Sequence, residues 1–155
     1  MTLKQFTLMT GLLLLAAASP GNGREKKIDR RDLPAAVEKT VARESEGATI
    51  RGFSVETENG RRIYEAALLV NGRRKDISMD ADGKILEVEE EVAIESLPAK
   101  VRESLTRQAG AGTITRVESV TKGGKLAGYE AAVTTGKKHA EIHAGPAGET
   151  SAHRK

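Results

Sequence analysis

A short stretch near the end of the chain places three potential metal ligands on one side of a strand. His139, Glu141 and His143 are two residues apart, so in a β-strand their side chains point to the same face. Imidazole and carboxylate groups bind zinc or copper. Three such ligands along one strand lie roughly 6–7 Å apart, too far to meet at one ion unless the strand bends or another ligand joins. Two interpretations stay open: a metal or small-ligand site, and a solvated outer face.

A second stretch, Asp80-Ala81-Asp82-Gly83, begins in the way that a calcium loop does. Such a loop needs a bidentate glutamate in its twelfth position, which would be Glu91. The intervening residues 85–88 have the pattern of a strand, which a calcium loop does not contain. We therefore interpret this stretch as a hairpin turn.

Motifs of catalysis are not found in the sequence. It has no His-Glu-x-x-His pair, no nucleophile elbow, no phosphate-binding glycine loop and no cysteine. Three histidines in 155 residues leave few groups for acid–base chemistry. The sequence predicts neither an enzyme nor a cofactor.

The elements that carry these residues occur twice. Tyr64-Glu65-Ala66-Ala67 returns 65 residues later as Tyr129-Glu130-Ala131-Ala132, and Leu33-Pro34-Ala35 returns 64 residues later as Leu97-Pro98-Ala99. Several anchors agree on one offset, which indicates a tandem duplication with one residue gained in the second copy.

Each copy is predicted to open with a helix. Asp32 and Ser96 are suited to cap the two helices, and a proline follows two residues later in each copy. Apolar residues recur every four positions along each helix and so form a stripe that faces a core. These stripes are Leu33, Val37 and Val41 in the first copy, and Leu97, Val101 and Leu105 in the second; Gly47 and Gly110 end the helices.

Alternating strands separated by turn residues follow each helix. The expected ranges are 49–57, 62–70, 75–79 and 84–90 in the first copy, and 113–120, 126–134 and 138–144 in the second. Residues 149–155 are polar, so we expect the last strand of the second copy to be frayed or absent. The fold class is α+β: two tandem α-β-β-β(-β) repeats in a two-layer structure, with both helices on one face of an antiparallel sheet.

The first residues predict export. Lys4, the apolar residues 6–15 and Ala16-Ala17-Ala18 are typical of a signal peptide over residues 1–18. The apolar run is shorter than the roughly 20 residues that span a bilayer, so we expect cleavage and only transient membrane contact. Without cysteine the chain cannot be a lipoprotein. We expect a periplasmic or secreted protein, with a flexible basic linker at residues 19–31 and repeats at 32–95 and 96–155.

Charge is distributed unevenly between the copies. Residues 32–95 carry 15 acidic and 9 basic side chains, and residues 96–155 carry 5 acidic and 10 basic ones, a polarity that the net charge of +3 conceals. Opposite charge favours pairing of the copies within one chain or in a homo-oligomer. Few aromatic residues and a near-neutral balance argue against nucleic acid as a partner. Another exported or envelope protein is the expected partner.

The repeated motifs resemble those of PepSY and PepSY-like proteins. The similarity rests on Leu33-Pro34, Tyr64-Glu65-Ala66-Ala67 and Asp80-Ala81-Asp82-Gly83-Lys84-Ile85, and it covers residues 32 to about 149. The tandem arrangement is similar to the PepSY-like proteins grouped with the β-lactamase-inhibitor-like fold. This resemblance implies an exported, non-enzymatic binding module, such as an inhibitor or regulator of a protease or another envelope protein. The second copy departs from the pattern at residues 145–148, where the acidic turn is missing.

Overall fold

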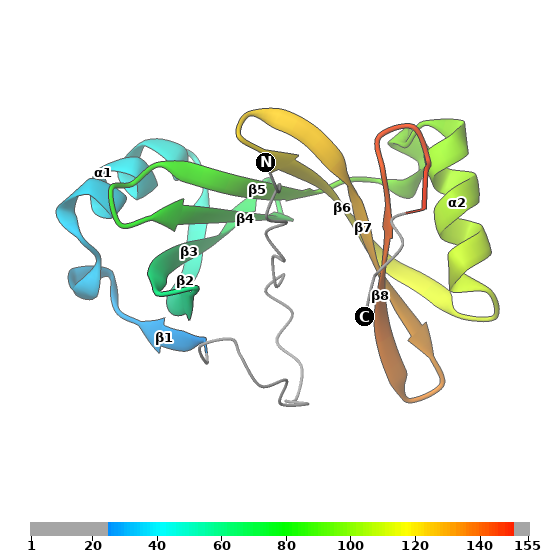
Figure 1. Cartoon of the computed structure of the whole chain (residues 1–155), viewed down its shortest axis with the longest axis horizontal. Helices are drawn as coiled ribbons and strands as arrows, with labels where there is room; N and C mark the ends of the chain where they lie inside the picture. Colours follow the sequence, from blue (N-terminus) through cyan, green and yellow to red (C-terminus); the bar gives the residue numbers. More distant parts are fainter. Residues whose placement is uncertain (1–24, 151–155) are drawn as a thin grey trace.

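A computed structural model describes residues 25–150; the predicted signal peptide, the first part of the linker and residues 151–155 lie outside this range. One antiparallel sheet contains eight strands in the order of the sequence (Figure 1). The elements are β1 (Lys26–Ile28), α1 (Ala35–Glu44), β2 (Thr49–Glu58), β3 (Arg61–Val70), β4 (Arg73–Asp80), β5 (Ile85–Glu91), α2 (Ala99–Ala109), β6 (Thr113–Lys122), β7 (Lys125–Thr135) and β8 (Lys138–Ala144). Four strands follow α1 and three follow α2, as the alternating patterns of the two copies predict.

The predicted linker is wrong for its described part. Residues 26–28 form β1, which pairs antiparallel with β2, and Arg30–Asp32 form a short 3-10 helix. Ile28 lies opposite Phe53 and packs against the first core. A strand at a sheet edge gains its stability from backbone hydrogen bonds, which a polar, charged composition does not reveal.

The predicted helix caps are also wrong. Each helix begins one residue after a proline, and no side chain caps it. The Asp32 carboxylate accepts a hydrogen bond from the Asp29 amide, and the Ser96 hydroxyl donates one to the Ala93 carbonyl. Both residues belong to 3-10 turns that precede the helices, so their side chains are used there.

Both helices cover the same face of the sheet, which confirms the predicted architecture. In the first copy Ala66 lies opposite Ile77, and in the second Ala131 lies opposite Ile142, on the helix-covered face. The pairing of β5 with β6 continues one sheet across the two copies. Figure 1 shows the helices at opposite ends of the long axis, with β5 and β6 between them.

Each helix packs on a core of its own. The stripe residues predicted from the sequence are buried in both: Leu33, Val37 and Val41 in the first, and Leu97, Val101 and Leu105 in the second. The strands contribute Tyr64, Ala66, Leu68, Ile77 and Met79 to the first core, and Val117, Ala131 and Ala144 to the second. The duplication therefore reproduces one packing unit twice.

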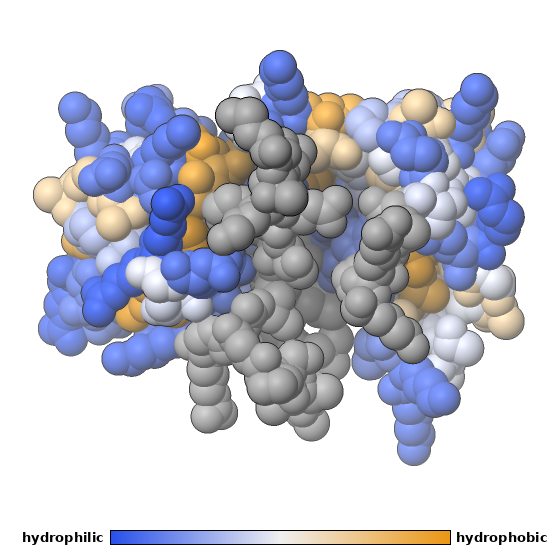
Figure 2. All heavy atoms as spheres, in the orientation of Figure 1, coloured by the Kyte–Doolittle hydropathy of each residue, from blue (hydrophilic) through white to orange (hydrophobic). Residues whose placement is uncertain are grey.

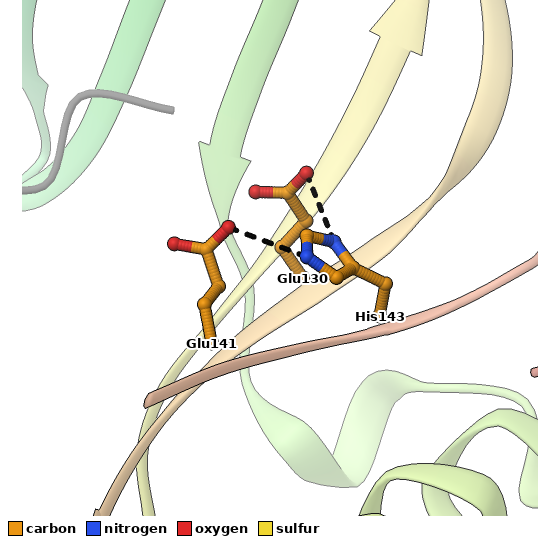
Figure 3. Close-up of side chains that lie close together, drawn as sticks. All are labelled: Glu130, Glu141 and His143. Atoms are coloured by element: carbon orange, nitrogen blue, oxygen red, sulfur yellow. Dashed lines mark ion pairs between the residues drawn. The ribbon is translucent and has the colours of Figure 1, made fainter. Parts of the chain in front are cut away.

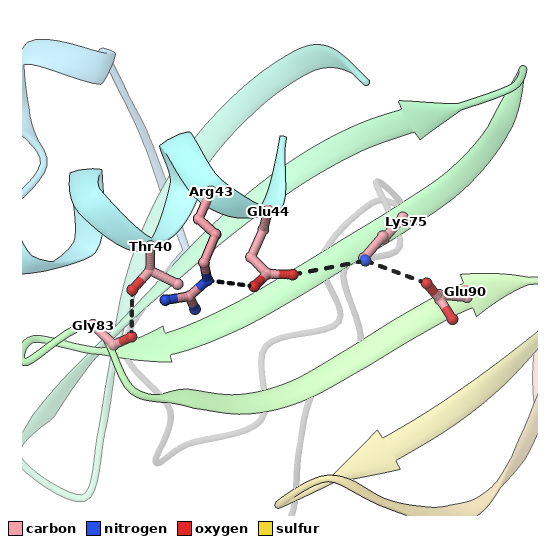
Figure 4. A network of polar contacts seen from close by, with 6 residues as sticks. All are labelled: Thr40, Arg43, Glu44, Lys75, Gly83 and Glu90. Atoms are coloured by element: carbon pink, nitrogen blue, oxygen red, sulfur yellow. Dashed lines mark hydrogen bonds and ion pairs between the residues drawn. The ribbon is translucent and has the colours of Figure 1, made fainter. Parts of the chain in front are cut away.

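A buried hydrogen bond ties α1 to the turn between β4 and β5 (Figure 4). The Thr40 hydroxyl donates to the Gly83 carbonyl oxygen at 2.7 Å. Asp80 accepts hydrogen bonds from the amides of Asp82 and Lys84, both at 3.0 Å, which confirms the hairpin turn. At the other end of α1, the Lys75 ammonium lies 3.9 Å from Glu44 and 3.3 Å from Glu90.

The last strand of the second copy is reduced to one bridge between Ala144 and Thr150 within the described residues. Residues 151–155, where most of the expected frayed or absent strand would lie, are outside the described range. None of the helices formed by residues 25–150 is long and apolar enough to cross a membrane.

Candidate functional site

The sheet face opposite the helices gathers acidic side chains from both copies. Because successive residues of a strand alternate between faces, burying Tyr64 and Ala66 under α1 turns Glu65 outward. The same alternation applies to β2 and to β4–β8. We call the following nine carboxylates the acidic face: Glu56, Glu58, Glu65, Asp76, Glu87, Glu89, Glu118, Glu130 and Glu141.

The sheet curls, so that strands distant in the sheet share this face. Burial is the main reason why the pKa of Glu58 on β2 is raised, and the charge of Glu87 on β5 raises it further. The charge of Lys122 on β6 lowers it. Glu58 is 6% exposed, and its Oε1 atom has no hydrogen-bond partner. Over β2–β4 a hollow of about 380 Å³ is lined by Lys27, Arg74 and the carboxylates of Glu65 and Asp76, among others.

Carboxylates of the first copy are held in a poorly solvated, acidic environment. Burial raises the pKa of Glu65 to about 7, and the charge of Asp76 adds to the rise. Burial likewise raises the pKa of Glu56 to about 7 and that of Asp76 to about 6. Within residues 25–150 no basic side chain forms an ion pair with Glu56, Glu58 or Glu65. These groups would be stabilised by an incoming positive charge.

A carboxyl pair marks the junction between the copies. Glu87 is 2% exposed, and its Oε2 atom lies 2.9 Å from the Lys122 ammonium. Burial and a hydrogen bond with Glu87 raise the pKa of Glu89, so Glu89 is protonated at neutral pH. On β6, Glu118 pairs with Arg116 at 2.8 Å. Both cations come from the second copy and meet an acidic face that is mostly supplied by the first.

The structure brings together two of the three metal ligands predicted from the sequence. His143 Nδ1 lies 3.2 Å from Glu130 Oε1, and His143 Nε2 lies 3.6 Å from Glu141 Oε1 (Figure 3). His139 is not part of this group: its Nδ1 atom lies 3.2 Å from the Thr134 hydroxyl. The hydrogen bond with Glu130 is the main reason why the pKa of His143 is raised.

Glu130 is the residue that the sequence prediction missed. It lies on β7, directly opposite His143 on β8, although the two are 13 positions apart in the sequence. A signal was present, since Glu130 belongs to the repeated Tyr-Glu-Ala-Ala motif and follows the inward-pointing Tyr129. Only the strand register, however, places it beside His143.

The coloured surface in Figure 2 is mainly hydrophilic, with hydrophobic residues in small patches. Leu126, at 44%, is the exposed large hydrophobic residue among those described. Residues 25–150 therefore do not present an extended apolar docking surface. Charge is the dominant property of its helix-free face.

No family model matches the chain, and no curated protein matches its sequence. Solved structures do match. A BLIP-like protein from Bacteroides fragilis is 19% identical, with a TM-score of 0.54 over 77% of this chain and 83% of its own. A DUF2874 family protein from Bacteroides ovatus is 17% identical, with a TM-score of 0.58 over 76% and 84%. A protein from Bacteroides eggerthii that is inferred to be periplasmic is 16% identical, with a TM-score of 0.61 over 76% and 85%.

These likenesses confirm, at the level of the fold, the resemblance seen in the sequence motifs. At such low sequence identity, these likenesses show the fold alone. The chain has the two-helix, antiparallel-sheet fold of BLIP-like and DUF2874 family proteins.

Proposed function

We propose that this chain is an exported, non-enzymatic binding module whose acidic face receives a lysine- or arginine-rich segment of another envelope protein. The observation that carries the proposal is the concentration of nine carboxylates on one curled sheet face, several with pKa values raised by burial. A cationic segment would compensate Glu56, Glu58 and Glu65, with which no basic side chain of residues 25–150 forms an ion pair.

Binding is favoured over catalysis by the distribution of these groups. They are spread over β2 to β8 of an open sheet, whereas an active site concentrates a few groups in one cleft. Export is supported by the leader-like residues 1–18 and by the inferred periplasmic location of a structural neighbour.

A finer form of the proposal is that binding restrains the partner. The likeness to a BLIP-like protein supports this, as does the resemblance to inhibitor-like PepSY modules. The partner would then be an enzyme, such as a protease, with basic residues beside its active site. Loss of its activity on binding would distinguish restraint from simple attachment.

The first experiment measures binding of the purified chain to an immobilised Lys/Arg-rich peptide by biolayer interferometry, with a Glu/Asp-rich peptide of equal length as control. We expect binding to the basic peptide alone. The affinity should fall as salt rises from about 50 to about 300 mM, because the Debye length is longer than about 10 Å at the lower concentration and shorter at the higher one. The double variant Glu56→Gln and Glu65→Gln should bind at least about tenfold more weakly.

A matched control is Glu38→Gln. Glu38 is an acidic residue of α1 that pairs with Arg30 at 2.7 Å and lies outside the acidic face. Its loss should leave peptide binding unchanged. Equal weakening by both kinds of variant, or no binding at low salt, would contradict the proposal.

The partner itself is sought by photo-crosslinking in the envelope. A photoreactive residue at Glu56 should capture a defined protein, and the same residue at Arg107, exposed on α2, should not. The captured protein is then assayed with and without the purified chain. Capture only from position 107 would place the interface on the helices and overturn the choice of face.

A further inference from the structure

We propose that Glu130, Glu141 and His143 form a zinc-binding site on the helix-free face of the second copy. The inference goes beyond the partner-binding function and does not depend on it. Each of the three residues offers one ligand atom, and these atoms all lie within 4.8 Å of one another. Figure 3 shows the imidazole of His143 between the two carboxylates.

The strand pairing removes the geometric objection raised by the sequence. Ligands along one strand diverge, but directly opposite residues of neighbouring antiparallel strands have Cβ atoms about 4.5–5.5 Å apart. Glu130 and His143 are such a pair, and Glu141 precedes His143 by two residues on the same face. A tetrahedral zinc ion with bonds of about 2.0–2.2 Å needs ligand atoms separated by roughly 3.3–3.6 Å. The two carboxylates face different ring nitrogens of His143, Glu130 at Nδ1 and Glu141 at Nε2, so an ion held at Nδ1 beside Glu130 requires the Glu141 side chain to rotate from Nε2 towards it.

The donor set favours zinc over calcium. One imidazole nitrogen and two carboxylate oxygens are typical zinc ligands, whereas calcium takes six to eight oxygens and has no use for a ring nitrogen. Three protein ligands leave a fourth position for water or for a side chain of a bound partner.

The nearby charged groups on the neighbouring strands are already paired with one another. Glu118 lies opposite Glu130 on β6, the strand that flanks β7 on its other side, and it pairs with Arg116 at 2.8 Å. Lys122 opposes a cation here, but it is engaged with Glu87 at 2.9 Å. Behind the site, the Gln108 side chain of α2 donates a hydrogen bond to the His143 carbonyl at 2.8 Å, which anchors the ligand-bearing strand to the helix. This contact fixes the position of the backbone that carries the His143 side chain.

The first copy provides an internal comparison. Glu65, Asp76 and Ser78 occupy the places of Glu130, Glu141 and His143, and Glu65 lies opposite Ser78. Two carboxylates are thus present in both copies, and the imidazole only in the second. One zinc ion for each chain is therefore expected.

The test is isothermal titration calorimetry of the purified chain with Zn²⁺ alone, and with Ca²⁺ as the comparison ion. We expect one zinc equivalent for each chain and no heat from calcium at the same concentration. His143→Gln and Glu130→Gln should each weaken zinc binding at least about tenfold, because even an outer-shell change costs 10–100-fold. His139→Gln is the matched control: the same strand and the same substitution, at a histidine outside the group, should leave the affinity unchanged.

Each result bears on the proposal. No zinc binding by the folded wild-type chain, or binding that His143→Gln leaves intact, would overturn it, as would equal losses in His139→Gln and His143→Gln. Far-ultraviolet circular dichroism establishes that each variant is folded, and visible absorption of the Co²⁺-loaded chain reports the coordination independently of heat. A tetrahedral cobalt spectrum that disappears in Glu130→Gln is expected; an octahedral one would contradict the geometry. Peptide binding is measured without zinc, so failure of this site leaves the partner proposal separately testable.

Discussion

Glu65 lies directly opposite Ser78 on the neighbouring strand, in the same register that places Glu130 opposite His143 in the second copy. The duplication has therefore kept the carboxylate and changed the residue that faces it. In the first copy the result is a desolvated glutamate whose pKa is raised to about 7, and in the second an ion pair. A single position separates an acidic patch from a potential metal site.

This relationship predicts that Ser78→His creates a second zinc site. Glu65 and Asp76 would then supply the carboxylates, because they stand where Glu130 and Glu141 stand in the second copy. We expect the zinc stoichiometry measured by calorimetry to rise from one to two. Ser78→Asn, similar in polarity but without an imidazole, should leave it at one. Unchanged stoichiometry in a folded Ser78→His chain would show that the two copies are not equivalent at this place.

Stability is predicted to fall as pH rises from about 4.5 to about 7. The folded-state pKa values of Glu56 and Glu65 are raised to about 7 from 4.5, so the folded chain binds more protons than the unfolded chain within that window. The stability that these two carboxyl groups contribute is fully present below about pH 4.5 and is lost as the pH rises through about 7. His143, with its raised pKa, acts in the same direction above its unfolded value. Differential scanning calorimetry should give a Tm at pH 8 lower than at pH 5 by about 3 °C or more.

The matched variant for the pH experiment is Glu65→Gln. It removes a carboxylate that folding desolvates, so the Tm at pH 8 should rise and the difference between pH 5 and pH 8 should shrink. Glu38→Gln removes a carboxylate whose pKa is lowered by its hydrogen bond with Arg30, and it should not shrink that difference. A Tm that rises from pH 5 to pH 8 would show that the buried carboxylates do not control the pH dependence of stability.

The contact between α1 and the β4–β5 turn is predicted to be sensitive to loss of one hydroxyl. Thr40→Val keeps the shape but removes the donor to the buried Gly83 carbonyl, and an unpaired buried group costs about 1–3 kcal/mol. Thr40→Ser retains the donor and should cost less. Urea denaturation followed by circular dichroism measures both free energies of unfolding. Equal losses in the two variants would mean that the methyl group, and not the hydrogen bond, stabilises this contact.

Alanine substitutions at two glycines with a left-handed backbone are predicted to differ in their cost to stability: Gly83 in the β4–β5 turn and Gly60 in the β2–β3 turn. Gly83 has a φ of +75°, and a Cβ there would meet the Ala36 carbonyl oxygen, whereas at Gly60, with a φ of +79°, it would meet nothing within 4 Å. Gly60→Ala should therefore cost about 1 kcal/mol, the strain of the backbone alone. Gly83→Ala must also displace α1 and should cost clearly more in the same denaturation experiment. A difference smaller than about 0.5 kcal/mol would indicate that the helix shifts without penalty.

The sequence alone determined the duplication, the order of helices and strands, and which residues of each strand point to the core. These are local properties, because the periods of four residues in the helices and two in the strands are read within one element. Val37, Val41, Val101 and Leu105 are buried as their spacing predicts. The repeated motif also carried the fold class, since two copies of one pattern require the same packing twice.

Tertiary structure decided what depends on the pairing of distant segments. The edge strand β1 forms because backbone groups of residues 26–28 meet β2, and its charged composition gave no sign of this. Curling of the sheet buries Glu58 and Glu87, which look like exposed polar residues in the sequence. Glu130, and not His139, lies beside His143, because Glu130 stands directly opposite it on the neighbouring strand. The register between these strands is set by turns and by packing of the whole sheet.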